Sequence, residues 1–344
     1  MTKRADPIAI IGAGSWGTAL GKLLGDQGLA VRLWVYEADV CDALRRTGTN
    51  PVYLPEVTLG ETVSYHTAFE EALSGAALAC FVTPSHVLRE VATACARDVP
   101  ENAAILSATK GMESDTAMLP AEVLADVLGE GVLGRLAALS GPSFAVEVTR
   151  GLPTAVTVAA RDEKVGRALQ ETFATPAFRV YLSSDVKGVQ FGGAVKNVIA
   201  IATGIADGLG LGHNARAALI TRGLAEMMRL GQRMGADPLT LSGLSGLGDL
   251  VLTCTSELSR NRTLGFRIGR GEALDRITAG TPMVAEGVRT STAVVRLAER
   301  LNVEVPISRQ VHEILHDGKP PRVAVHELMA RELKAEQPPS IHTS

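Results

Sequence analysis

The sequence predicts an α/β protein in which an N-terminal, Rossmann-type doubly wound sheet is followed by an all-α C-terminal domain. Three observations lead to this prediction. The first half alternates short apolar runs with segments of helical periodicity, which is typical of βαβ units. A glycine-rich loop, "GAGSWG", directly follows the first apolar run. After about residue 187 the alternation ends, and long segments with a 3.6-residue period replace it.

The apolar runs of the first half are expected to be strands of one mostly parallel sheet. Because they are apolar almost throughout, helices should cover both faces of this sheet. The runs are "PIAIIGAG", "AVRLWVY", "ALACFVTP", "AAILSATKG", "LAALSGPS", "PTAVTVAA" and "FRVYLSSD".

The second half is expected to be helical. Residues 1–187 are interpreted as a dinucleotide-binding domain and residues 188–334 as a helical domain that carries the substrate and catalytic groups. The polar tail 335–344, with two prolines, is expected to be disordered. The predicted helices span 189–206, 213–235, 260–271, 287–301 and 306–317.

Composition excludes several classes of function. The net charge of −3 gives no reason to expect a nucleic-acid or membrane-surface partner. The four cysteines form no CxxC pair and no zinc-type cluster, so we expect no metal site and a reduced, cytoplasmic location. The segment 188–206 is long enough for a membrane span, but Lys196, Gln190, Asn197 and four glycines argue against one.

The glycine-rich loop predicts a dinucleotide site. Gly12, Gly14 and Gly17 have the GxGxxG spacing, which permits a tight turn, close approach of a pyrophosphate and close packing of the next helix. The N-terminus of that helix would then face the phosphates. A glycine-rich turn without a ligand is the alternative, but a strand before the loop and a helix after it favour nucleotide binding.

An acidic residue is expected at the end of the second strand, where it would bind the adenosine ribose. Glu37 stands there, and its carboxylate favours NAD and would repel the 2′-phosphate of NADP. The alternative is that Glu37 or Asp39 only adds negative charge to the first turn of the next helix.

Two further segments follow predicted strands, where ligands bind in open α/β sheets. "SATKG" carries Lys110, which suits an anion or is simply a solvated lysine. "SGPSFA" predicts a tight turn with exposed N–H groups.

A third segment, "GLGDLVLTCTSELSRNR", contains Asp249 and begins a basic run. This run suits a phosphate, and its arginines are Arg260, Arg262, Arg267 and Arg270. The negative net charge argues against a nucleic-acid patch, and some of these arginines are expected to be solvated.

Lys196 is the lone charge of an otherwise apolar stretch. At helical spacing it shares a narrow polar stripe with Thr203 and Asp207. Burial and a neighbouring cation would lower its pKa toward neutrality, so that it could accept a proton. The alternative is a buried ion pair, most simply with Asp249.

Together these motifs resemble one family closely, the NAD(P)-dependent glycerol-3-phosphate dehydrogenases. The resemblance covers about residues 7–320. It implies interconversion of sn-glycerol 3-phosphate and dihydroxyacetone phosphate, supply of glycerol 3-phosphate for phospholipids, and a homodimer. The motifs that carry it, in order, are "GAGSWGTAL", "NPVYLPEV", "ATKG", "GPSFA", "GGAVKNVIAIATGIADGLGLG", "GLGDLVLTCTSELSRNR" and "AEGVRT".

The resemblance also assigns roles to residues. Lys196 matches the proton acceptor. The substrate positions it implies are Lys110, Gly141, Ser143, Lys196, Asp249, Ser259, Arg260 and Asn261. The cofactor positions, with the glycines of the loop, are Ser15, Trp16, Tyr36, Glu37, Tyr53, Lys110, Ala145, Arg260, Val284 and Glu286.

One departure bears on the cofactor. Many bacterial members carry arginines after the second-strand tryptophan, whereas this chain has "WVYEAD", similar to the NAD-specific eukaryotic branch. The cofactor is therefore expected to be NAD or NADP, with NAD preferred. Two alternatives remain: a dehydrogenase of the 3-hydroxyacid or 6-phosphogluconate type, and a sensor that binds NADH without turnover.

Overall fold

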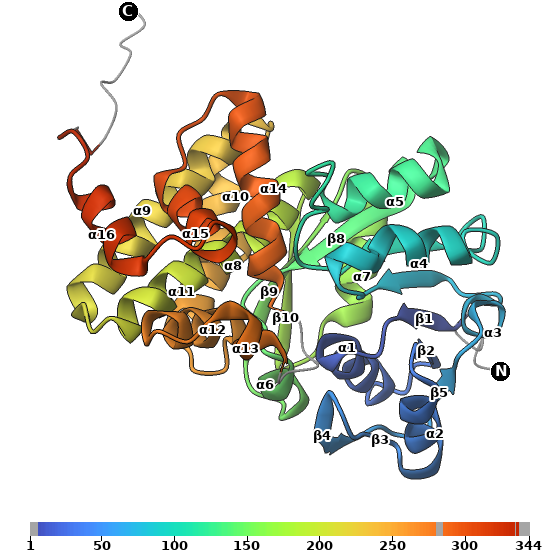
Figure 1. The fold of residues 1–344 in the computed structure, drawn as a ribbon. Helices are drawn as coiled ribbons and strands as arrows, with labels where there is room; N and C mark the ends of the chain where they lie inside the picture. The colour runs from blue at the N-terminus through green and yellow to red at the C-terminus, as the bar shows by residue number, and fades with distance from the viewer. Residues whose placement is uncertain (1–5, 280–284, 334, 337–344) are drawn as a thin grey trace, which may run out of the picture.

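An eight-stranded sheet forms the frame of the N-terminal half, on the right of Figure 1. The computed structural model describes residues 6–279, 285–333 and 335–336. The strand order is β10-β9-β8-β7-β6-β1-β2-β5, and all neighbours are parallel except β8 and β9. The strands are β1 (Ile8–Ile11), β2 (Val31–Trp34), β5 (Val63–His66), β6 (Leu78–Phe81), β7 (Ala104–Ser107), β8 (Leu136–Ser140), β9 (Thr154–Ala160) and β10 (Phe178–Ser183).

All seven predicted strands are confirmed, and three further strands were not predicted. β5 reads "VSYH", in which only Val63 is buried, so it lacks the continuous apolar run of the central strands. β3 (Thr49–Asn50) and β4 (Leu54–Thr58) form a separate antiparallel pair that contains Pro55. Short, polar or proline-containing strands of this kind carry little sequence signal.

Helices cover both faces of the sheet and create two apolar cores. Alternation along β1 shows the division: Ile8 and Ile10 belong to one core, and Ala9 and Ile11 to the other. The sheet therefore has the two covered faces predicted from its apolar strands. The helices of this half are α1 (Ser15–Gly25), α2 (Ala38–Thr47), α3 (Phe69–Leu73), α4 (Leu88–Cys95), α5 (Pro120–Leu128), α6 (Ala145–Thr149) and α7 (Glu163–Phe173), with 3₁₀ turns at Ser85–Val87 and Glu130–Arg135.

The order of the strands creates a crevice for ligands. From β1 the chain proceeds to β2 and β5 on one side, then returns to β6 on the other side of β1. This reversal is a topological switch point, and ligands of open α/β sheets bind at the carboxyl ends of the strands there.

The C-terminal half is helical over the described residues and surrounds one central helix, α8 (Val186–Gly208). The five predicted helices are confirmed, whereas the short elements between them and the helix that follows the last of them were not predicted. The other helices are α9 (Gly212–Arg233), α10 (Pro238–Ser242), α11 (Asp249–Thr255), α12 (Arg260–Gly269), α13 (Leu274–Ala279), α14 (Glu286–Leu301), α15 (Pro306–His316) and α16 (Pro321–Met329), with a π turn at Leu244–Gly248.

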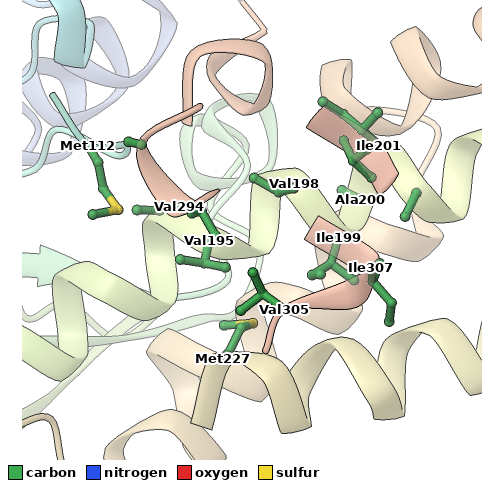
Figure 2. Close-up of a cluster of buried hydrophobic side chains, with 14 of the residues drawn as sticks. Met112, Val195, Val198, Ile199, Ala200, Ile201, Met227, Val294, Val305 and Ile307 are labelled. Carbon is green, nitrogen blue, oxygen red and sulfur yellow. The ribbon is translucent and has the colours of Figure 1, made fainter. Parts of the chain in front are cut away.

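Helix α8 is buried almost throughout because its side chains are apolar or small on nearly every face. Figure 2 shows Val195 and Ile199 of α8 on the side of Met227 of α9 and Val305, within one cluster of buried side chains that also includes Val198. By length and composition α8 could cross a membrane, but the window that meets this criterion lies entirely inside the protein. The helix is thus the core of the C-terminal half.

The predicted domain boundary after Lys187 falls within the first turn of α8, which Asp185 caps through the N–H of Gly188 at 2.8 Å. The predicted tail, apart from Ala335 and Glu336, lies outside the described residues, as does Val284.

Candidate active site between the sheet and the helical half

The glycine loop forms a cradle at the carboxyl end of β1. Gly12 has φ +120°, and a Cβ on Gly17 would lie 1.8 Å from the carbonyl oxygen of Gly12, so the turn requires glycine at both positions. A Cβ on Gly14 would meet no atom within 4 Å. Gly14 is also the N-cap of α1 and offers no side chain to its free N–H groups. The loop thus leaves space and donors for a pyrophosphate.

The expected ribose-binding carboxylate lies next to this loop. Tyr53 donates a hydrogen bond from its hydroxyl to Glu37 Oε1 at 2.6 Å, and its carbonyl oxygen accepts one from Ser15 Oγ at 2.8 Å. Glu37 makes no side-chain capping bond to α2, whereas Asp39 lies in the first turn of that helix. Glu37, as the N-cap residue, and Asp39 both lie at the N-terminus of α2, so both are compatible with the helix-charge alternative, while the carboxylate of Glu37 also contacts Tyr53. Tyr36 is 78 % exposed beside them.

Asn50 supports the loop from behind, a role that the sequence analysis missed. Its fully buried amide donates to the carbonyl of Ala13 at 2.7 Å and to Thr18 Oγ1 at 2.9 Å. Its carbonyl oxygen accepts the N–H of Tyr53 at 3.0 Å. The motif "NPVYLPEV" marked this residue without indicating its partners. Elsewhere around the loop, Trp16 and Ala145 pack against one small apolar cluster.

Lys196 lies at the centre of a buried charge cluster. Its Nζ lies 2.5 Å from Asp249 Oδ1 and 2.9 Å from Thr253 Oγ1. Lys110, which follows β7, contacts the other oxygen of Asp249 at 2.8 Å and the carbonyl of Gly141 at 3.0 Å. Ser143 donates to that same carbonyl at 3.1 Å. The predicted Lys196–Asp249 pair is confirmed, and one carboxylate joins two lysines from the two halves of the protein.

Electrostatics of the cluster leave Lys196 able to exchange a proton near neutrality. Burial lowers the pKa of Lys196 to about 8, Asp249 opposes this shift, and the nearby Lys110 lowers the pKa further. Asp249 is itself buried, but the two ammonium groups hold the pKa of its carboxyl below the ordinary value. Burial, rather than Lys110, is therefore the main cause of the shift in Lys196.

Thr253 was not identified from the sequence. It lies four residues after Asp249 on α11, so both side chains lie on the same face of that helix. Its hydroxyl also donates to the carbonyl of Asp249 at 2.6 Å, which directs the oxygen lone pairs toward Lys196. The i, i+4 spacing is the signal that could have found it.

The N-terminus of α12 provides a second group of donors. Ser259 is the N-cap and accepts the N–H of Arg262 at 3.2 Å. Asn261 is buried and donates to Asn197 at 2.9 Å, while its carbonyl oxygen accepts the N–H of Gly287 at 3.0 Å. Ser259 and Asn261 thus use their side chains within the fold. The backbone N–H groups of Arg260 and Asn261 have no partner among the described residues.

The four arginines of the basic run have different surroundings. Arg262 pairs with Asp207, Arg267 pairs with Glu272, and Arg270 lies over the ring of Phe266. The side chains of Arg260 and Arg270 make no hydrogen bond or ion pair to another described residue, and of these two only Arg260 also lacks a ring contact. Its accessible surface is large, but surrounding protein atoms lower the pKa of its guanidinium, while the carboxylate of Glu286 opposes the shift.

Glu286, at the start of α14, connects the two halves near Arg260. Its carboxylate accepts hydrogen bonds from Ser85 Oγ at 2.6 Å and from the N–H of Ser85 at 3.2 Å. Burial raises its pKa, and the Ser85 hydrogen bonds oppose this. Ser85 follows β6 and lies 201 residues before Glu286, so no local pattern could have predicted their contact.

Comparison with known proteins agrees with this geometry. Residues 7–166 match the model of the NAD-dependent glycerol-3-phosphate dehydrogenase N-terminus, and residues 185–326 match that of the C-terminus. A relative from Geobacter sulfurreducens named glycerol-3-phosphate dehydrogenase (NAD(P)+) is 51% identical over 97% of this chain and 99% of its own length. A relative of the same name from Syntrophotalea carbinolica is 52% identical over 96% of this chain and 99% of its own length.

Solved structures give the same result. The crystal structure of glycerol-3-phosphate dehydrogenase from Coxiella burnetii is 43% identical, has a TM-score of 0.91, and the match covers 95% of this chain and 99% of that one. With a glycine cradle, a buried lysine cluster and matches over nearly the whole chain, the protein belongs to the NAD-dependent glycerol-3-phosphate dehydrogenase family.

Proposed function

We propose that this protein interconverts sn-glycerol 3-phosphate and dihydroxyacetone phosphate by hydride transfer with NAD(P), and thereby supplies glycerol 3-phosphate for phospholipid synthesis. The observation that carries the proposal is the buried Lys196 with its pKa of about 8, joined through Asp249 to Lys110 beside the nucleotide cradle. Residues 1–187 serve as the dinucleotide domain and residues 188–334 as the substrate domain.

Lys196 is the proton-transferring group. In oxidation its neutral amine accepts the proton of the C2 hydroxyl, and in reduction its ammonium returns that proton. When bound, the nicotinamide would supply or accept the hydride at C2. Asp249 and Thr253 hold the amine in place, and Lys110 orients the substrate oxygen with the turn at Gly141 and Ser143. Such acid–base assistance is worth roughly 10²–10⁴-fold.

The substrate phosphate binds at the N-terminus of α12. Two free backbone N–H groups, the positive end of the helix and the unpaired guanidinium of Arg260 all favour an anion there. Ser259 and Asn261 contribute by fixing the first turn. The phosphate thus meets the positive charge of Arg260 and the hydrogen-bond donors of the backbone.

The cradle of Gly12, Gly14 and Gly17 would hold the pyrophosphate of the cofactor. Ser15, Trp16, Tyr53 and Ala145 surround this cradle, whereas Arg260 and Glu286 belong to the part of the site toward the substrate. Val284, which the family resemblance also implies for the cofactor, lies outside the described residues. Glu37 and the adjacent Tyr36 favour the ribose of NAD over the phosphorylated ribose of NADP, because the Glu37 carboxylate would repel a 2′-phosphate. We propose NAD as the preferred cofactor on this basis.

The protein acts in the cytoplasm as a homodimer. Four buried, unpaired cysteines support a reducing location. The dimer rests on the family resemblance.

The substrate assay tests this function. Purified protein with NADH should reduce dihydroxyacetone phosphate rapidly and dihydroxyacetone poorly, because the latter lacks the group that binds Arg260. Preferred oxidation of 3-hydroxyacids would instead favour the related dehydrogenase class. NADH binding without any turnover would indicate a sensor.

A further inference from the structure

The carboxylate of Asp207 is held by two arginines from two different helices. Arg216 of α9 contacts Oδ1 through Nε at 2.9 Å and through a terminal nitrogen at 2.7 Å. Arg262 of α12 contacts Oδ2 through Nε at 3.0 Å and a terminal nitrogen at 2.8 Å. The side chain of Asp207 is only 6% exposed. It therefore joins the end of α8 to α9 and to the first turn of α12.

Asp207 also shares α8 with the proton-transferring lysine. It follows Lys196 by eleven residues, which is three helical turns or about 16 Å along the axis. A rigid, buried α8 thus carries Lys196 near its middle and, at its end, the carboxylate that fixes α12. Helix α8 therefore links the position of α12 to that of the amine, in addition to the contact of Asn261 with Gly287 of α14.

A close helix contact fixes α12 further along. Gly204 and Gly208 of α8 face α12, where added Cβ atoms would lie 2.1 Å from the carbonyl oxygen of Arg262 and 2.3 Å from that of Phe266. On α12, Cβ atoms at Gly265 and Gly269 would lie 2.2 Å and 2.4 Å from carbonyl oxygens of α8. Side chains at these positions would push the helices apart. The glycines set the separation of the two helices, and the Asp207–Arg262 pair fixes the first turn of α12.

Charge within that first turn gives Asp207 a second effect. Arg260 and Arg262 both lie at the positive end of the α12 dipole, where a cation is unfavourable. Asp207 offsets part of this charge, since it pairs with the guanidinium of Arg262 as well as with that of Arg216. Among the described arginines of this turn, Arg260 alone is then free to meet an anion.

We propose that Asp207 is a positioning residue for the substrate phosphate: through Arg262 it sets the location of the α12 N-terminus and leaves Arg260 as the free cation. The identity of the anion rests on the function proposed above, whereas the positioning role concerns any phosphate bound at α12.

The sign of one effect separates positioning from simple electrostatics. Asp207→Asn removes a negative charge near the phosphate site, so Coulomb attraction alone would tighten phosphate binding. Loss of positioning predicts the opposite, because a small displacement of binding groups weakens the interactions that depend on their geometry. The matched control is Glu272→Gln, which removes the carboxylate partner of Arg267 near the other end of α12.

We would measure the Kd of inorganic phosphate by calorimetry, and the KM values for dihydroxyacetone phosphate and NADH. For Asp207→Asn we expect a phosphate Kd and a substrate KM about tenfold higher, with the KM for NADH within about twofold of wild type. Glu272→Gln should have the wild-type phosphate Kd and the wild-type KM values for dihydroxyacetone phosphate and NADH. Unchanged or tighter phosphate binding in a folded Asp207→Asn protein would overturn the proposal.

Arg262→Gln provides a second test if Asp207→Asn does not fold, since Arg216 still pairs with Asp207 in that variant. It should raise the phosphate Kd in the same direction, and a folded variant with wild-type affinity would overturn the proposal. Wild-type protein that binds phosphate but does not reduce dihydroxyacetone phosphate would contradict the proposed reaction and leave the positioning test intact.

Discussion

At the scale of single residues, the site depends on one carboxylate that serves two lysines. Asp249 contacts Lys110 and Lys196 through different oxygens, so the cluster carries a net positive charge when both amines are protonated. Burial makes the second proton costly, and Lys196, the more buried amine, loses it more readily. The buried ion pair and the catalytic role, which the sequence analysis treated as alternatives, are compatible in this arrangement.

The pH dependence of the reaction should follow Lys196. Its neutral amine is needed for oxidation and is populated as pH rises through about 8. We therefore expect kcat/KM for glycerol 3-phosphate oxidation to rise with pH and level off above about 8. The reverse reaction needs the ammonium and should decline over the same range. Initial-rate profiles in both directions test this, and profiles that rise together would contradict the assignment.

The proposed cofactor preference rests on one side chain, Glu37. If the adenosine ribose binds beside Glu37, as we propose, the carboxylate would repel the 2′-phosphate of NADP, so kcat/KM should be higher with NADH than with NADPH. Replacing Glu37 with Gln should narrow the ratio because the repulsion is lost. Assays of each protein with NADH and with NADPH measure this ratio of kcat/KM values. A wild-type preference for NADPH would show that the Glu37 argument is wrong.

At the scale of elements, helix ends are held by distant polar side chains. Glu226 of α9 is buried and accepts the N–H groups of Ile307 and Ser308 at 2.6 and 3.1 Å, together with the Ser308 hydroxyl at 3.0 Å. These donors form the first turn of α15, where Pro306 has no N–H. A carboxylate from a neighbouring helix thus replaces a local cap.

Removing this cap should destabilise the protein. Glu226→Ala leaves three donors without their acceptor and should lower the free energy of unfolding by about 1–3 kcal/mol. Urea denaturation at neutral pH measures the loss, with the exposed Glu171→Ala as a control expected to change it by less than about 0.5 kcal/mol. Equal stability of the two variants would contradict the capping role.

The same residue should affect how stability depends on pH. Burial raises the pKa of folded Glu226 from 4.5 to about 7. Because the folded carboxyl binds its proton more tightly than the unfolded one, the proton-linked part of its contribution to the free energy of unfolding is fully present below 4.5 and is lost as pH rises through about 7. The hydrogen bonds to Ile307 and Ser308 are a separate contribution. In Glu226→Ala, the free energy of unfolding should therefore lack the decline between pH 4.5 and about 7 that this carboxyl causes in the wild type.

At the scale of the whole molecule, the division into a sheet and a helical half could be predicted because each has its own hydrophobic period. Continuous apolar runs such as that of β1 indicate strands covered on both faces, and α8 is apolar almost all round. β3, β4 and β5 were missed because they are short and interrupted by polar residues or proline. Their formation depends on neighbours that local sequence does not specify.

In the site, too, features with a local sequence signature could be predicted, whereas contacts between distant segments could not. The glycine loop and the lone lysine have local signatures, so both were predicted, and Asp249 was the simplest partner. The contacts of Ser85 with Glu286 and of Asn197 with Asn261 join segments far apart in the chain. Only tertiary packing brings these pairs together, and family motifs marked some of them without revealing their partners.

The central claim is that Lys196 transfers the proton in a dehydrogenase reaction on dihydroxyacetone phosphate. The most direct measurement compares turnover and NADH affinity in wild type, Lys196→Ala and the control Lys187→Ala, which alters a lysine of the same helix paired with Glu122 at 3.6 Å. We predict that Lys196→Ala loses at least about 10²-fold in kcat with NADH affinity within about twofold, while Lys187→Ala resembles wild type. Turnover of Lys196→Ala close to that of wild type would contradict the account.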